Sequence, residues 1–266
     1  MAIAAAFLAA TLTELGHDVR RLAAPVDWAA DIVITTISPT WRRLHAAAVE
    51  AGALERVVYW HHANGVPEPC GHTLAAPPSI PMHEGWPRHV VLPPSSWAVE
   101  DGGERTGRDV VVAGCGPAKG GHVALEVARL CPELSWYALR GRSSMVDQAP
   151  WRSLPNAEVA DGIVAPEFFL ARARVVLSPT RFDVHPLLLV EAAVRGIPVV
   201  CTDLPGTRAA AGPHAFYLPM TAPVEAWAEV VRCAMSSEPP KLELPPYRDV
   251  VARALEHMVG DRRAAA

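Results

Sequence analysis

Short apolar runs alternate with longer helical patterns along most of the chain. The runs are typical of strands covered on both faces, and they lie at 32–37, 57–60, 90–92, 109–113, 135–139, 175–178 and 197–202. A further short strand is predicted at 18–22. Helices are predicted at 3–15, 39–51, 122–130, 187–195, 222–235 and 247–259. Strands that alternate with helices predict βα units around a parallel sheet, and therefore an α/β fold.

A polar, glycine-rich stretch, Glu100–Arg108, interrupts this alternation and predicts a boundary between two domains. We expect an N-terminal domain at 1–104 and a second domain at 105–244. The second domain restarts with a buried strand, a glycine-rich loop and a helix, as doubly wound sheets do. Such sheets bind ligands at the carboxyl ends of their strands, so the loops at that edge are where a site is expected.

The composition of the chain argues against several classes of protein. Half of the 266 residues are hydrophobic and 20% are charged, which excludes intrinsic disorder. The net charge of -4 argues against a non-specific binder of nucleic acid or anionic membranes. The sequence lacks an uninterrupted apolar run of about 18 residues, so no transmembrane segment is predicted. The apolar start, Met1–Leu12, has no basic flank and is interpreted as a helix rather than a signal peptide.

The five cysteines are scattered along the chain, odd in number, and form no CxxC pair. This pattern is typical of reduced, buried thiols rather than of a disulfide framework or a structural zinc site. We therefore expect a cytoplasmic protein without a bound metal.

The densest motif is Ser178–Gly206, SPTRFDVHPLLLVEAAVRGIPVVCTDLPG. It places Asp183 and Glu191 eight positions apart, with Pro186 at the start of a predicted helix between them. The amides that follow Pro186 would point out of a helix N-terminus, where an anionic phosphate is stabilised. Glu191, about one turn into that helix, is placed to accept hydrogen bonds from a pair of vicinal hydroxyls. Taken alone, two carboxylates at this spacing are also explained by a helix cap and a solvated surface.

A second motif, Val110–Gly121 (VVVAGCGPAKGG), combines a buried strand, a glycine-rich loop and the start of a helix. Its lysine is notable because Lys119 and Lys241 are the only lysines among 24 basic residues. Lys119 is interpreted either as an anion-binding group or as an ordinary surface lysine. The loop is not a phosphate-binding loop of the Walker A type, since no Ser or Thr follows the lysine.

Together the two motifs resemble the GT-B nucleotide-sugar glycosyltransferases, in particular the large retaining family (family four type) whose motif is Glu, seven residues, Glu. In that family the motif follows Pro-Ser-aromatic and precedes E-A-x-x-x-G-x-P-V-V-x-T-D-x-x-G, and SPTRF and EAAVRGIPVVCTDLPG match these parts. VVVAGCGPAKGG is similar to the family's strand followed by G-R-x-x-x-x-K-G. The resemblance implies a GT-B fold of two Rossmann-like βαβ domains. The N-terminal domain would be reduced, and a C-terminal helix at 245–260 would return to it.

The resemblance also implies roles in binding the donor. Glu191 would hold the ribose of the nucleotide, and Lys119 would neutralise the diphosphate. The leucine amides at the start of the predicted helix would contact the same diphosphate. The implied donor-binding residues are Gly116, Lys119, Gly120, His185, Pro186, Leu187, Leu188 and Glu191.

Four positions depart from the family pattern. Asp183 takes the first acidic position, which touches hydroxyls of the donor sugar in relatives, and it is one methylene shorter than the usual Glu. His185 and Pro186 replace an aromatic-glycine pair, and Pro186 has no backbone N–H. Gly114 stands where relatives have an arginine, so one cation that would stabilise the departing diphosphate is missing.

The N-terminal half resembles the family more faintly, in LTELGHDVRRL, ADIVITT and VVYWHHANG. The last of these implies that His61 or His62 reaches the donor sugar near the scissile bond, although both are also explained as structural histidines. The implied catalytic set is therefore His61, His62, Lys119 and Asp183. In relatives a strand and a glycine-rich loop precede the first helix, whereas this chain begins inside that helix. We expect either a truncated start or a compact version with a reduced acceptor domain.

The resemblance implies a retaining transfer of a sugar from a nucleotide-sugar, used as co-substrate, to a hydroxyl acceptor. It implies neither a metal nor another cofactor. One alternative is a phage-type enzyme that glycosylates hydroxymethylated DNA bases, with aromatic and cationic residues at 41–43, 60–62 and 86–89 receiving an extruded base. Residues 1–108, with eight arginines and eleven acidic residues, argue against it. A second alternative is a degenerate, non-catalytic GT-B module that binds a nucleotide.

Overall fold

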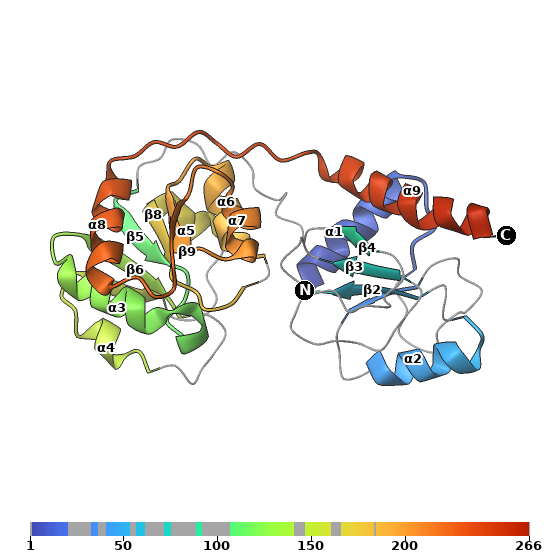
Figure 1. Cartoon of the computed structure of the whole chain (residues 1–266), viewed down its shortest axis with the longest axis horizontal. Helices are drawn as coiled ribbons and strands as arrows, with labels where there is room; N and C mark the ends of the chain where they lie inside the picture. The colour runs from blue at the N-terminus through green and yellow to red at the C-terminus, as the bar shows by residue number, and fades with distance from the viewer. Residues whose placement is uncertain are drawn as a thin grey trace. The chain divides into compact units, whose positions relative to one another are not determined.

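Two separate parallel sheets organise the chain in the computed structural model (Figure 1). The structure describes residues 2–20, 33–36, 41–53, 57–61, 72–75, 89–91, 107–140, 147–160, 166–183 and 185–265. By its internal contacts the chain divides into a first unit, Met1–Ser95 with Pro245–Ala266, and a second unit, Ser96–Leu244. The α/β class predicted from the sequence is confirmed.

The second unit is built on a six-stranded sheet in the order β10-β9-β8-β5-β6-β7, and every pair of neighbouring strands is parallel. Its strands are β5 (Asp109–Val112), β6 (Ser135–Leu139), β7 (Ala157–Ala160), β8 (Ala173–Ser178), β9 (Val199–Thr202) and β10 (Phe216–Leu218). The connecting segments are η2 (Pro117–Lys119), α3 (Gly121–Leu130), α4 (Ala149–Arg152), α5 (Pro166–Arg172), α6 (Leu187–Val194), α7 (Pro205–Ala211) and α8 (Val224–Met235).

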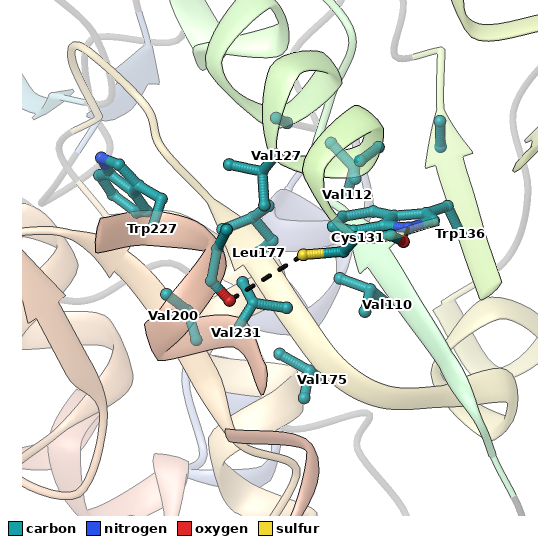
Figure 2. Close-up of a cluster of buried hydrophobic side chains, with 14 of the residues drawn as sticks. Val110, Val112, Val127, Cys131, Trp136, Val175, Leu177, Val200, Trp227 and Val231 are labelled. Atoms are coloured by element: carbon teal, nitrogen blue, oxygen red, sulfur yellow. Dashed lines mark hydrogen bonds between the residues drawn. The ribbon is translucent and has the colours of Figure 1, made fainter. Parts of the chain in front are cut away.

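Helices cover both faces of this sheet, and the consecutive buried valines of β5 contribute to the core on each face. Because successive side chains of a strand point to opposite faces, Val110 and Val112 pack on one side and Val111 on the other. The first cluster, drawn in Figure 2, joins the sheet to α3 and α8 and includes Val127, Cys131, Trp136, Leu177, Trp227 and Val231. The second joins it to α5, α6 and α7 and includes Leu170, Val176, Leu189, Val190, Ile197 and Ala210.

The strand order creates a reversal between β5 and β8. After β5 the chain adds β6 and β7 on one side, and it then crosses to build β8, β9 and β10 on the other side. The loops that follow β5 and β8 therefore lead away from neighbouring strands in opposite directions. In open α/β sheets a crevice forms at such a switch point, at the carboxyl ends of the strands.

The first unit has a four-stranded parallel sheet in the order β1-β2-β3-β4. Its strands are β1 (Val33–Thr36), β2 (Val57–His61), β3 (His72–Ala75) and β4 (His89–Val91), and its helices are α1 (Ala2–Glu14), α2 (Trp41–Glu50) and α9 (Tyr247–Ala265). The terminal helix α9 contacts both α1 and β4 (Figure 1). Leu8 and Leu12 of α1 are buried, as are Val251 and Ala254 of α9.

The strand predicted at 18–22 is absent from its described part, since Asp18–Arg20 has no regular structure. Arg20 instead forms an exposed ion pair with Asp18. Within Asp18–Arg20 one face of a strand would carry two charged side chains and the other would carry Val19, so pairing in a sheet would bury little apolar surface. No helix within the described ranges combines the length and the apolar character needed to cross a bilayer.

Candidate donor site at the switch point of the second unit

The glycine-rich loop after β5 folds into a tight turn that presents Lys119 at the carboxyl edge of the sheet. The carbonyl oxygen of Gly116 accepts the amides of both Lys119 and Gly121 at 3.0 Å. Gly120 adopts a left-handed conformation with φ of 71°. A Cβ on Gly120 would lie 1.8 Å from the carbonyl oxygen of Pro179, in the loop after β8. Only glycine therefore allows the two loops to approach this closely.

Thr180 fastens the two loops together. Its side chain is completely buried, and its Oγ1 lies 3.2 Å from the carbonyl oxygen of Ala118 and 3.0 Å from that of Phe182. The amide of Arg181 donates to the same Ala118 oxygen at 3.1 Å. A buried hydroxyl needs such acceptors, because leaving it unbonded costs free energy. The loops after β5 and β8 are thereby held in one fixed arrangement.

This arrangement brings Lys119 and Asp183 into direct contact. The Lys119 Nζ forms an ion pair with Asp183 Oδ2. The side chain of Asp183 is 15% exposed and that of Lys119 is 45% exposed, so the pair lies at the protein surface with the carboxylate on the inner side. Asp183 Oδ1 also accepts the backbone N–H of His185 at 3.2 Å. Two residues that the sequence assigned to the donor site are therefore neighbours.

Helix α6 begins directly beside this pair. Pro186 is its N-cap, with φ of -68°, rather than a residue of its first turn. Its carbonyl oxygen accepts the amides of Leu189 and Val190 at 3.0 and 3.4 Å. The amides of Leu187 and Leu188 precede the helical ladder and have no acceptor within it. They form the positive end of the helix dipole, which favours an anion.

Glu191 lies one turn into α6 and is partly buried. Burial raises the pKa of its carboxyl from 4.5 to about 7, with a further rise from Glu167 that Arg195 opposes. The guanidinium of Arg195 donates to the backbone carbonyl oxygen of Glu191 at 3.1 Å. Among the described residues no hydrogen bond from the Glu191 carboxyl is seen, so its oxygens can still accept hydroxyl groups.

His185 is partly buried between Asp183 and Pro186. Burial lowers the pKa of its imidazole to about 4, although the charge of Asp183 acts in the opposite direction. The ring is therefore neutral near pH 7. Its Nδ1 is buried and has no hydrogen-bond partner among the described residues.

The two histidines predicted near the scissile bond are in the first unit. His61 is the last residue of β2. Its side chain and the whole of His62 lie outside the described residues. Within the described ranges, no three His, Cys, Asp or Glu side chains come together as metal ligands would. Thr180 was missed by the sequence reasoning, and its signal in the sequence was a hydroxyl two residues after the end of a buried strand.

No protein-family model matches the sequence, and no curated protein matches it. Solved structures do share its fold. AviGT4, a glycosyltransferase involved in avilamycin A biosynthesis, is 16% identical with a TM-score of 0.52, and the match covers 98% of this chain and 87% of that one. A glycosyltransferase from Rickettsia africae ESF-5 is 8% identical with a TM-score of 0.54, covering 83% and 76%.

The pneumococcal O-GlcNAc transferase GtfA, solved in complex with UDP and GlcNAc, is 12% identical with a TM-score of 0.51, covering 80% of this chain. The chain spans about half of the length of GtfA (51%) and 43% of the length of TarM, another structural neighbour. These similarities confirm the predicted GT-B fold with Rossmann-like units.

Proposed function

We propose that the protein transfers a sugar from a nucleotide-sugar donor to a hydroxyl acceptor. The observation that carries this proposal is the convergence of Lys119, Asp183 and the start of α6 at one switch point. A cation, two amides free of the helical ladder and a helix dipole favour a diphosphate. The carboxylate of Asp183 beside them favours a ligand that also carries hydroxyl groups. A nucleotide-sugar contains both kinds of group.

In this proposal Lys119 and the amides of Leu187 and Leu188 bind the diphosphate. Glu191, about one turn deeper into α6, accepts the ribose hydroxyls. Asp183 contacts the transferred sugar. Gly116 and Gly120 shape the loop that holds Lys119 in place.

The proposed reaction breaks the bond between the anomeric carbon and the diphosphate oxygen, whose electron pair stays with the diphosphate. The acceptor oxygen bonds to the anomeric carbon on the same face, so the configuration is retained, and the acceptor proton passes to an oxygen of the leaving phosphate. The charge that develops on the diphosphate is stabilised by Lys119 and the α6 amides. The nucleotide-sugar is the co-substrate, and the step as written uses neither a metal nor another cofactor. The roles near the scissile bond that were predicted for His61 and His62 stay predictions.

The acceptor is proposed to be a hydroxyl of a small molecule or a glycan. Eight arginines and eleven acidic residues in residues 1–108 disfavour polyanionic DNA at this part of the chain. The two can be separated by offering hydroxymethylated DNA at two salt concentrations. If DNA binding weakens with salt and the DNA also gains the sugar, the acceptor is DNA rather than a small molecule or a glycan.

The proposal is tested with four pairs of ligands: UDP, GDP, ADP and dTDP, each with its glucose derivative. We expect one pair to raise the melting temperature of the protein and to bind in calorimetry, and its sugar derivative to release the nucleoside diphosphate when an acceptor is present. Lys119→Ala should abolish most of this binding. Lys241→Ala is the matched control, because Lys241 is the other lysine of the chain and lies outside the switch point.

Two outcomes would contradict the proposal in different ways. A folded protein that binds none of the four pairs would overturn it completely. Binding of a nucleoside diphosphate, with no release from any sugar donor or acceptor tried, would instead favour the degenerate nucleotide-binding module. That second result would fit the absence of a cation at Gly114.

A further inference from the structure

The two ring nitrogens of His185 stand in different environments. Nδ1 is buried and has no hydrogen-bond partner in the part of the chain that the structure describes. Nε2 makes no hydrogen bond to the described part of the chain, yet it is not one of the fully buried polar atoms that lack a partner. The ring therefore turns Nδ1 into the protein, whereas Nε2 is not fully enclosed.

This asymmetry indicates which nitrogen carries the hydrogen. The ring is neutral because burial lowers its pKa to about 4. A neutral imidazole has one N–H donor and one bare acceptor nitrogen. Burying an N–H without an acceptor costs more than burying a bare nitrogen, since the strong donor loses its bond to water. The hydrogen is therefore assigned to Nε2, which is the nitrogen that is not fully enclosed.

The neighbours of His185 are complementary to this donor. Asp183, whose carboxylate is fixed by the His185 amide and by Lys119, keeps further lone pairs that can accept a hydrogen bond. Pro186, the next residue, has no N–H to offer. Beside the Lys119 ammonium, this point of the site therefore offers one acceptor carboxylate and one neutral side-chain donor.

We propose that Asp183 and His185 together bind a single hydroxyl group of the transferred sugar, a proposal that rests on the proposed function. A hydroxyl both donates and accepts a hydrogen bond. It can donate to the carboxylate of Asp183 while it accepts from Nε2–H of His185. A phosphate oxygen fits less well, because it only accepts and would be repelled by Asp183. His185 is therefore a residue that determines specificity for the sugar, whereas Lys119 and the α6 amides serve the diphosphate.

The test compares the affinity for a nucleotide-sugar with that for its nucleoside diphosphate, using whichever of the four pairs binds the wild type. His185→Phe keeps a planar ring and removes both nitrogens. We expect it to weaken the nucleotide-sugar by roughly 2- to 10-fold, as for one neutral hydrogen bond, and to leave the nucleoside diphosphate unchanged. His185→Gln, whose amide nitrogen reaches the position of Nε2, should restore the sugar affinity. His185→Asn, whose amide reaches only the position of Nδ1, should not.

If His185→Phe is poorly folded, the comparison of His185→Gln with His185→Asn still tests the proposal, because the two amides differ in the ring nitrogen that they replace. Adding Pro186→Gly to His185→Phe supplies a backbone N–H next to the lost donor, and part of the sugar affinity should return. Deoxy analogues of the sugar then identify the hydroxyl, because exactly one analogue should bind wild type and His185→Phe equally.

The possible failures are distinguishable. If the wild type binds none of the four pairs, the proposed function is overturned. If the wild type binds a pair but His185→Phe weakens nucleoside diphosphate and nucleotide-sugar alike, or neither, only the role of His185 is overturned. The same holds if no deoxy analogue removes the effect of the substitution.

Discussion

Lys119 and Asp183 stand 64 residues apart in the chain and form an ion pair across the two loops of the switch point. The contact exists because β5 and β8, which these loops follow, are neighbours in the sheet. A diphosphate that binds to Lys119 must compete with the carboxylate of Asp183 for the same ammonium group. The pair therefore links the binding of the phosphates to the position of the residue proposed to contact the sugar.

Lys119→Ala should weaken the binding of the nucleoside diphosphate by about 10- to 100-fold, the usual value for a hydrogen bond to a charged group. The change removes the ammonium without adding bulk, so the melting temperature should stay nearly constant. Calorimetric titration of both proteins checks the affinity. An unchanged affinity would show that Lys119 is an ordinary surface lysine.

Asp183→Asn should act in the opposite direction on the nucleoside diphosphate. It removes the anion that competes for Lys119 and should raise the affinity by about 1.5- to 5-fold, since partly exposed ion pairs contribute little. The same variant should lose sugar transfer, because the amide accepts hydroxyl groups less well than a carboxylate. A fall in the affinity for the nucleoside diphosphate itself would place Asp183 on the phosphate side of the site.

Gly120→Ala should unfold the glycine-rich loop after β5. The added Cβ would meet the carbonyl oxygen of Pro179 at 1.8 Å, and the left-handed backbone adds about 1–2 kcal/mol. Gly52→Ala is the matched control: Gly52 also has a left-handed backbone, with φ of 61°, but open space around its Cβ position. Thermal unfolding should show a clearly larger loss for Gly120→Ala, together with loss of nucleotide binding. Equal losses would mean that the contact with Pro179 is unimportant.

The strands at the centre of the second unit were predicted from sequence because they are runs of consecutive apolar residues. β5 and β8 are such runs, and burial on both faces is what this pattern means. β7 (Ala157–Ala160) and β10 (Phe216–Leu218) were missed, because they are short strands at the edges of the sheet and carry little of the pattern. Edge strands depend on pairing with a neighbour, which a single segment of sequence does not reveal.

In the site, too, single residues were predicted from their motifs, whereas contacts between distant segments were not. Lys119 and Asp183 were each assigned to the donor site from their motifs, whereas their direct pairing depends on the order of the strands. Thr180 was overlooked because a buried hydroxyl becomes informative only when its partners across the loops are known. The orientation of the His185 ring also had no signal in the sequence, since it depends on packing around Nδ1.

Glu191→Gln should stabilise the protein at high pH and weaken it as a nucleotide binder. The raised pKa of about 7 means that the folded protein holds a proton that the unfolded chain, with a pKa near 4.5, releases. Wild-type stability therefore declines as the pH rises from about 4.5 to about 7 and then levels off, and the glutamine variant lacks this decline. Melting curves should coincide near pH 5 more closely than at pH 8, where the variant should melt a few degrees higher. Affinity for the nucleoside diphosphate should fall at pH 8, because the amide replaces a carboxylate acceptor.

Gly114→Arg should strengthen the binding of the leaving diphosphate. A Cβ on Gly114 would lie 3.2 Å from the Cβ and Cγ of Lys119, so an arginine side chain there starts beside the existing cation. A second positive charge should raise the affinity for the nucleoside diphosphate by about 10-fold, provided that Lys119 shifts by a few tenths of an ångström and that the backbone at Gly114, with φ of 158°, accepts a side chain.

Gly114→Ala separates this charge effect from the crowding of Lys119. It introduces the same Cβ contact without a guanidinium and should leave the affinity unchanged or slightly lower. Multiple-turnover kinetics should then show faster release of the nucleoside diphosphate from the sugar donor by Gly114→Arg than by either wild type or Gly114→Ala, because the added cation acts on charge that grows as the bond breaks. If the arginine variant binds more tightly but turns over no faster, the missing cation is not what limits transfer.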